Sequence, residues 1–311
     1  MAIEILHPGL ATALHDSGRY GWQHFGVPIS GAMDLFSHQL ANRLAGNSDD
    51  PATLEMTLQG ARLHFLRRAV IVLTGADLSP MLDGEPVEML RPLTVPAGAV
   101  LSFGARRRGA RCYLAIKGGF AAPEIMGSQS TCSGSAFGGY GGRYLKKGDR
   151  LAFRWPLHNI SRSLAPFGLP DIFPQPLQVL RFIPGKHWDR LTGEAKQRFT
   201  DSVFTVSPYS DRMGYRLQGE ALTLSQPADI YSEAVSRGTV QLPADGLPII
   251  LLADSQTTGG YPKIAHIATM DLPYLAQALP GAQFCFRQIS LHTAQQLAYQ
   301  RQQWLEKIPC G

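Results

Sequence analysis

Short apolar segments bounded by turn-forming residues recur along most of the chain, and this pattern constrains the fold more than any other feature. The 311 residues include 32 glycines and 22 prolines. Brief runs of β-branched and aromatic residues between Gly and Pro are typical of strands, so we predict a mainly β fold with a few helices. The candidate strands are 69–74, 99–103, 112–116, 151–153, 177–183, 203–206, 239–242, 249–253, 264–268 and 283–289.

Helical periodicity occurs in fewer places. Residues 31–45 carry apolar side chains on one face of a predicted helix, with Ser30 as the expected N-cap. A second helix is expected over 188–199. Two later helices are predicted to be capped by Asp271 and Ser290.

A change of composition suggests two domains. Residues 156–176 are rich in Pro, Ser and irregular polar residues and show no firm period, as is typical of a linker. We therefore expect an N-terminal β-rich domain, 1–155, and a C-terminal β-rich domain with a terminal helix, 177–311. Each has the size of an ordinary domain.

Composition excludes several classes of protein. With 44% hydrophobic and 17% charged residues, the chain is expected to be a soluble globular protein. Neither a membrane-spanning apolar stretch nor a leader pattern is found, so we expect a cytoplasmic location. The formal charge of +5 favours an anionic ligand, but the basic run 106–108 lacks the interleaved aromatics of nucleic-acid binding. The four cysteines show no metal-ligand spacing and are expected to be free thiols.

The run 254–262, DSQTTGGYP, is the strongest candidate for a functional site. An apolar strand-like segment, 247–253, breaks there into hydroxyls, one carboxylate, one amide and two glycines. Exposed backbone N–H groups beside such side chains are suited to hold a small polar or anionic ligand. A tight turn closed by Gly-Gly and Tyr-Pro is the alternative interpretation.

A second run, 207–219, places Arg212 and Arg216 four positions apart around Gly214. Guanidinium groups bind carboxylate or phosphate through two parallel N–H groups, so the pair is a candidate anion clamp. Surface arginines on a hairpin would give the same pattern.

The glycine-rich stretch 127–143 is a third candidate, either as an anion-binding concavity with Lys117 and Arg143 as counter-charges or as a flexible surface loop. Other chemistries lack their motifs. The chain contains no phosphate-binding Gly-x-x-x-x-Gly-Lys-Ser/Thr and no nucleophile elbow between strand and helix. Its nine histidines do not form a helical pair with a carboxylate, which argues against zinc.

An ordered series of motifs resembles the carboxyltransferase-like family that contains the C-type subunit of 5-oxoprolinase, the second allophanate-hydrolase-type subunit and the carboxyltransferase part of urea carboxylase. The resemblance covers residues 3–288. Besides the runs 207–219 and 254–262, its motifs are SGAMD at 30–34, EMTLQG at 55–60, LTGAD at 73–77, GSQST at 127–131, GRYLKKGD at 142–149, YSEA at 231–234 and GTVQLP at 238–243.

This resemblance implies two cyclophilin-like β-barrel domains and a place in a multi-subunit enzyme. In the family, 5-oxoprolinase uses ATP to open the lactam of 5-oxoproline to glutamate. The chain is thus expected to act as the C-type subunit of this ATP-dependent hydrolase, together with a hydrolytic A-type and a cyclophilin-like B-type subunit, with ATP and Mg²⁺ as cofactors. Positioning and charge neutralisation dominate phosphoryl transfer, and Glu55, Asp77 and Asp254 are the carboxylates to test for the metal. No dedicated metal site is expected.

Two other functions within the family stay open. One is the carboxyltransferase component of a biotin-dependent urea or amide carboxylase. The chain has no lysine flanked by methionines in a small separate domain, so biotin would be attached to another chain. The other is a non-enzymatic antagonist of an inhibitor of a sensor kinase.

The expected site residues combine the motifs with the resemblance. The expected catalytic residues are Arg212, Arg216 and Asp254. The expected substrate- or nucleotide-binding residues are Ser30, Asp34, Asn42, Glu55, Thr74, Lys117, Gln256, Thr257, Thr258, Gly259, Gly260 and Tyr261.

Overall fold

A computed structural model describes residues 2–154, 173 and 175–308. Most of the expected linker, 156–172 and 174, lies outside these residues. The described chain forms two compact units. Unit 1 contains residues 2–20, 30–154 and 304–308, and unit 2 contains residues 21–29, 173 and 175–303.

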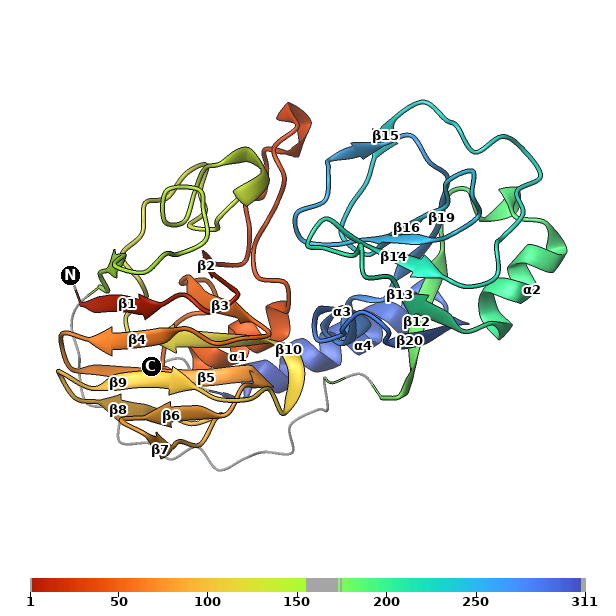
Figure 1. Cartoon of the computed structure of the whole chain (residues 1–311). Coiled ribbons are helices and arrows are strands. Elements are labelled where there is room, and N and C mark those ends of the chain that lie inside the picture. Colours follow the sequence, from red (N-terminus) through yellow and green to blue (C-terminus); the bar gives the residue numbers. More distant parts are fainter. Residues whose placement is uncertain (1, 155–172, 174, 309–311) are drawn as a thin grey trace. The chain divides into compact units, whose positions relative to one another are not determined.

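Unit 1 is built from two antiparallel sheets (Figure 1). The six-stranded sheet has the order β11 (Arg150–Leu151), β1 (Ile3–His7), β4 (Arg62–Phe65), β9 (Val100–Phe103), β6 (Pro80–Leu82) and β7 (Glu85–Pro86). The five-stranded sheet has the order β2 (Ala11–His15), β3 (Thr53–Thr57), β10 (Arg108–Ile116), β5 (Ala69–Asp77) and β8 (Leu93–Val95).

The central strands β5 and β10 are buried on both faces of their sheet. Because successive side chains point to opposite faces, each strand contributes to two hydrophobic clusters. Ile71, Leu73 and Leu114 belong to the main core with residues of the six-stranded sheet. On the other face, Val72 and Tyr113 pack against α1 (Leu35–Leu44). This double coverage explains the continuous apolar runs from which both strands were predicted.

Unit 2 contains a closed seven-stranded barrel (Figure 1). Its order is β12 (Leu177–Pro184), β19 (Lys263–Ile267), β16 (Thr239–Gln241), β17 (Ile249–Leu251), β14 (Gly214–Gln218), β13 (Phe204–Val206) and β20 (Gln283–Gln288). A separate two-stranded sheet joins β15 (Glu233–Ala234) to β18 (Thr258–Gly259). The ring of Phe199 stacks on that of Phe286 at a centroid distance of 4.4 Å and packs α2 (Gly193–Asp201) against the barrel.

The remaining helices are short except for the last. They are η1 (Gln23–Phe25), η2 (Ser133–Ser135), η3 (Trp188–Arg190), η4 (Thr269–Asp271), α3 (Leu272–Ala276) and α4 (Leu291–Glu306). The mainly β fold class and all ten candidate strands are confirmed, with ends shifted by a few residues. The helix expected over 188–199 is divided into η3 and α2, because Thr192 begins a new helix by accepting a hydrogen bond from Ala195 N.

One of the three predicted helix caps, Ser30, was wrong. Ser30 lies four residues before the cap, because Ser30 and Gly31 have φ of 56° and 86° and are not helical. Asp34 is the N-cap of α1 and accepts hydrogen bonds from the backbone N–H of Ser37 at 3.0 Å and from its hydroxyl at 2.7 Å. Asp271 is the N-cap residue of α3, as predicted, but its side chain makes no cap hydrogen bond because the carboxylate pairs with Arg181. Ser290 does cap α4, accepting from Thr293 N at 3.1 Å.

Candidate functional site

The loop predicted from the run 254–262 leaves the barrel after β17 and then pairs with β15. Within it, Thr258 and Gly259 form β18, opposite Ala234 and Glu233. The pairing continues on both sides: Val235 N donates to Thr257 O at 3.0 Å, and Ile230 N donates to Gly260 O at 2.9 Å. The loop is therefore anchored by its backbone, and the side chains of Thr258 and Tyr261 are exposed.

Two expected catalytic residues, Arg212 and Asp254, form an ion pair with each other. Arg212 Nε donates to Asp254 Oδ2 at 2.7 Å, and the terminal nitrogen donates to Oδ1 at 3.1 Å. The backbones also bond, Asp254 N to Arg212 O at 2.9 Å. The side chains are 11% and 13% exposed, so the guanidinium is held rigidly at the edge of the loop. Arg216 lies in β14 with an exposed side chain, and the anion clamp expected from both arginines stays a prediction.

Buried amides lie directly beneath the loop. Gln256 Nε2 donates to Gln241 Oε1 at 3.4 Å, and Gln241 is 2% exposed at the end of β16. Its own Nε2 has no hydrogen-bond partner among the described residues. A Cβ added to Gly259 would lie 2.4 Å from this Nε2, so only glycine lets the loop approach the amide so closely. Gln241 thus presents an unsatisfied donor under the predicted binding loop.

A charged cluster flanks the same loop. Glu233, opposite Gly259 in the ladder, accepts hydrogen bonds from Lys186 Nζ and Lys263 Nζ, each at 2.5 Å. These bonds, first that from Lys186 and then that from Lys263, lower the pKa of Glu233 to about 2. The carboxylate is shared between two cations, which leaves this edge of the loop with net positive charge.

This part of unit 2 is suited to bind rather than to attack a ligand. It combines an oriented guanidinium with the amides of Gln241, which is buried, and Gln256, which is half-buried; such groups match the carbonyl and carboxylate oxygens of a small polar molecule. Arg212, Asp254, Gln256, Gln241 and Gly259 are hereafter the amide site.

The expected residues of unit 1 form a separate buried network. Glu55 Oε2 accepts hydrogen bonds from the hydroxyl of Tyr113 at 2.8 Å and from Met33 N at 2.7 Å. The same hydroxyl accepts from Asp34 N at 2.7 Å. Burial, followed by the nearby Glu55 carboxylate, raises the pKa of Tyr113 well above its usual value. The network therefore holds the start of α1 on the five-stranded sheet.

The other expected residues of unit 1 have structural contacts. Thr74 donates to Ser37 O at 2.7 Å, and Asn42 donates to Pro51 O at 2.8 Å. Lys117 lies just after β10, with its backbone N–H bonded to Val70 O at 2.9 Å. Ser30 is buried, and its hydroxyl has no hydrogen-bond partner within the described ranges.

The motif at 127–131 surrounds an internal carboxylate. Asp16 accepts hydrogen bonds from Ser128 Oγ at 2.8 Å, from Gln129 N at 2.5 Å and from Ser130 Oγ at 2.5 Å. The backbone and hydroxyl donors that could serve a bound anion are therefore used by a residue of the chain itself. Arg143, expected as a counter-charge, is paired with Asp149 at 2.7 and 2.9 Å.

The carboxylates considered for Mg²⁺ do not fit a metal site. Asp254 is paired with Arg212, Glu55 is bonded to Tyr113 and Met33, and Asp77 accepts from Ser79 N. No group of three or more His, Cys, Asp or Glu side chains suited to a metal is found among the described residues. In the same part of the chain, none of the helices has the length and apolar character required to cross a bilayer.

Sequence reasoning missed several residues of these clusters, namely Gln241, Lys186, Lys263 and Tyr113. Gln241 had a signal, because a polar residue between the buried Val240 and Leu242 is unusual inside a strand. Lys186 had none, since it is far in sequence from the loop that it flanks.

The comparisons with known proteins match nearly the whole chain. The family model described as "Carboxyltransferase domain, subdomain A and B" matches residues 25–288. The chain is 36% identical to the C-type subunit of 5-oxoprolinase from Haemophilus influenzae, covering 98% of this chain and 97% of that protein. It is 35% identical to the same subunit from Escherichia coli, again over 98% and 97%. Among solved structures, urea carboxylase of Kluyveromyces lactis has a TM-score of 0.92 at 32% identity, covering 100% of this chain and 29% of that one.

Proposed function

Because this chain belongs to the family of carboxyltransferase domains with subdomains A and B, we propose that it is the C-type subunit of an ATP-dependent 5-oxoprolinase. In this proposal it assembles with an A-type and a B-type subunit and takes part in converting 5-oxoproline, ATP and water to glutamate, ADP and phosphate. The observation that carries the proposal is the end-to-end match to two proteins named as this subunit of 5-oxoprolinase. A role in a multi-subunit enzyme follows from the same names.

The amide site supports this choice by its chemistry. 5-Oxoproline carries a planar carboxylate and a lactam carbonyl. Arg212, oriented by Asp254, offers a guanidinium of the kind that binds carboxylates through two N–H groups. Gln241 offers a buried amide donor suited to the lactam oxygen. A site that hydrogen-bonds a substrate strongly disfavours analogues lacking the matching groups.

ATP with Mg²⁺ belongs to the proposal as the source of the phosphoryl group that activates the lactam. The three carboxylates considered for the metal, Glu55, Asp77 and Asp254, already accept hydrogen bonds within the chain, and the described residues hold no group of side chains suited to a metal. We therefore propose that the other subunits and the nucleotide itself hold the metal. The role left to this chain is to bind and orient the lactam.

Reconstitution tests the proposal. The chain is purified with its candidate A-type and B-type subunits, and release of glutamate and ADP is measured with 5-oxoproline, with urea and without substrate. We expect stoichiometric release with 5-oxoproline only, and none when this chain is omitted. Full activity of the other two subunits alone would contradict the proposal.

A matched pair of variants links the activity to the amide site. Gln241→Leu removes the buried amide, whereas Gln218→Leu changes an exposed glutamine of β14 in the same unit. Loss of a hydrogen bond in a dry site costs roughly 1.5 kcal/mol, or about tenfold in kcat/KM. We expect that loss for Gln241→Leu and none for Gln218→Leu.

Carboxyl transfer within a biotin-dependent urea or amide carboxylase is a second candidate function. The likeness over the full chain to the Kluyveromyces lactis urea carboxylase favours it. In that case the reconstituted system would require a biotinylated carrier and bicarbonate, and it would consume urea rather than 5-oxoproline. The same assay with and without these additions separates the two functions.

A further inference from the structure

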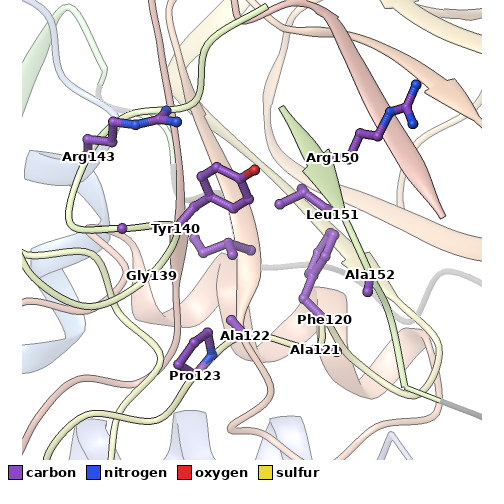
Figure 2. A pocket seen from close by; sticks show the side chains of 12 residues that line it. Phe120, Ala121, Ala122, Pro123, Gly139, Tyr140, Arg143, Arg150, Leu151 and Ala152 are labelled. Carbon is purple, nitrogen blue, oxygen red and sulfur yellow. The ribbon is translucent and has the colours of Figure 1, made fainter. Parts of the chain in front are cut away.

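Unit 1 contains an apolar cavity that the proposed function does not use. Its volume is about 330 Å³. It is lined by Leu14, by residues 120–123 and 139–141, by Arg143 and by residues 150–152. Figure 2 shows Phe120 and Leu151 on one side and Pro123 and Ala122 below, with Arg143 and Arg150 on either side of Tyr140.

The floor of the cavity is the core of the unit itself. Leu14, Phe120 and Leu151 are between 1% and 4% exposed and belong to the main hydrophobic cluster. Ala122 and Tyr140 pack against the same cluster. A ligand that binds in this cavity would therefore bury its apolar part against side chains whose positions the core already fixes.

Two of the lining residues are glycines in left-handed conformations. Gly139 has φ of 53°, and an added Cβ would lie 2.0 Å from Thr131 Oγ1. Gly141 has φ of 63°, and an added Cβ would meet no atom within 4 Å. The backbone at Gly139 is therefore packed against Thr131, whereas the space beside Gly141 is open.

The rim of the cavity is basic. Two arginines line it, namely Arg143, which is paired with Asp149, and Arg150. Arg150 is 53% exposed, and its nearest carboxylate oxygen, on Glu4, lies 3.6 Å away. The exposed guanidinium of Arg150, with only this long ion pair among the described residues, favours an anionic head group at the mouth.

Arg143 is held in place before any ligand binds. It donates to both carboxylate oxygens of Asp149 and to Tyr144 O at 3.0 Å, and its guanidinium lies 5.1 Å from the centre of the Tyr140 ring. The hydrogen bond between Arg143 and Asp149 raises the pKa of Arg143 and lowers that of Asp149. These contacts use the terminal nitrogens and leave Nε–H available for an acceptor.

We propose that this cavity binds a small amphipathic anion, an aromatic carboxylate, with its ring on Phe120 and Leu151 and its carboxylate at the rim near Arg150 and Arg143. The volume is within the range of small-molecule sites, and an apolar floor with a few polar groups at the mouth is their usual construction. The cavity is built entirely from unit 1, so the proposal is independent of the amide site.

Binding is measured with 1-naphthoate and with its neutral counterpart, 1-naphthalenemethanol, by calorimetry on the intact chain. We expect 1-naphthoate to bind about fivefold more tightly than the alcohol, because an exposed ion pair contributes up to about 1 kcal/mol. Raising the salt concentration should reduce this preference without changing the affinity for the alcohol. Equal affinities for the two probes, or no binding of 1-naphthoate, would overturn the proposal.

Three variants locate the probes. Ala152→Leu and, as an independent replacement, Ala122→Leu fill the cavity and should weaken both probes at least tenfold. Arg150→Gln should remove the preference for 1-naphthoate and leave the affinity for the alcohol unchanged. Lys147→Gln, which removes an equal charge from a position that does not line the cavity, is the matched control and should change little. Unchanged binding in either folded leucine variant would place the probes elsewhere and overturn the proposal.

Discussion

Gln241 lies so close beneath Gly259 that a single methyl group on the glycine would come within 2.4 Å of the glutamine Nε2. The strand β16 and the loop containing β18 are therefore closely packed against each other at this contact. This contact places the unsatisfied amide of Gln241 directly under the loop that the sequence identified as a candidate site.

Gly259→Ala should displace the amide of Gln241, because the added carbon would lie 2.4 Å from Nε2 at the end of that side chain. We expect kcat/KM of the reconstituted complex for 5-oxoproline to fall at least tenfold, with stability reduced by about 1 to 3 kcal/mol as in other overpacked sites. Gly193→Ala, in α2, is the matched control, because its Cβ would meet no atom within 4 Å. A Gly259→Ala complex with normal activity would show that the contact does not position the site.

The barrel strand of Gln241 and the central strands β5 and β10 were predicted correctly, because each is a short apolar run between turn residues. Several strands were missed, among them β3 (Thr53–Thr57) and β14 (Gly214–Gln218). In β3 the buried Glu55 breaks the apolar pattern, and in β14 a glycine and an arginine do so. In both strands, tertiary contacts outweigh the local sequence preference for or against a β-strand.

Site residues could be predicted where they lie within one continuous run of the sequence. They could not be predicted where their contact depends on which residues face each other across two strands. Glu55 lies opposite Tyr113 in the ladder between β3 and β10, and this pairing creates the buried network of unit 1. Nothing in the local pattern specifies which residues face each other across two strands. Glu55 was therefore identified because it belongs to a sequence motif, whereas its partner Tyr113 was not identified.

The start of α1 offers a direct test of helix capping. Asp34→Ala removes the side-chain acceptor for Ser37, and we expect the free energy of unfolding to fall by about 1 kcal/mol. Ser30→Ala removes no cap, since Ser30 lies outside the helix with φ of 56°. Thermal or urea unfolding of both variants measures the difference. Equal destabilisation by the two substitutions would contradict this assignment of the cap.

His38 should make stability depend on pH. Burial lowers its pKa in the folded chain below the usual 6.5. As the pH falls below about 6.5, the unfolded chain takes up a proton that the folded chain does not, so stability falls. Above that pH both forms are neutral and His38 contributes no slope. Urea unfolding between pH 5 and pH 8 measures this dependence. We expect His38→Asn to reduce the loss of stability on the acid side. An unchanged loss would assign the effect to His187 and His266, whose pKa values burial also lowers.

The two arginines of the run 207–219 should respond differently to the same conservative change. Arg212 is paired with Asp254 at two points, so Arg212→Lys should lower stability by about 1 to 2 kcal/mol through loss of the second hydrogen bond. Arg216 is exposed and makes no side-chain ion pair within the described residues. Its guanidinium is therefore a candidate for a second anion, beside the carboxylate proposed for Arg212, or for a neighbouring subunit of the complex.

Arg216→Lys should therefore leave the unfolding free energy of the chain unchanged and reduce turnover of 5-oxoproline in the reconstituted complex. A two-point contact to an anion in a dry site contributes roughly 1.5 to 3 kcal/mol, which corresponds to about one to two decades in rate. Co-purification with the candidate B-type subunit checks that assembly is intact, and Arg216→Gln should be at least as impaired as the lysine variant. Parental turnover in both variants would remove Arg216 from the site and leave Arg212 as the arginine that contacts the substrate.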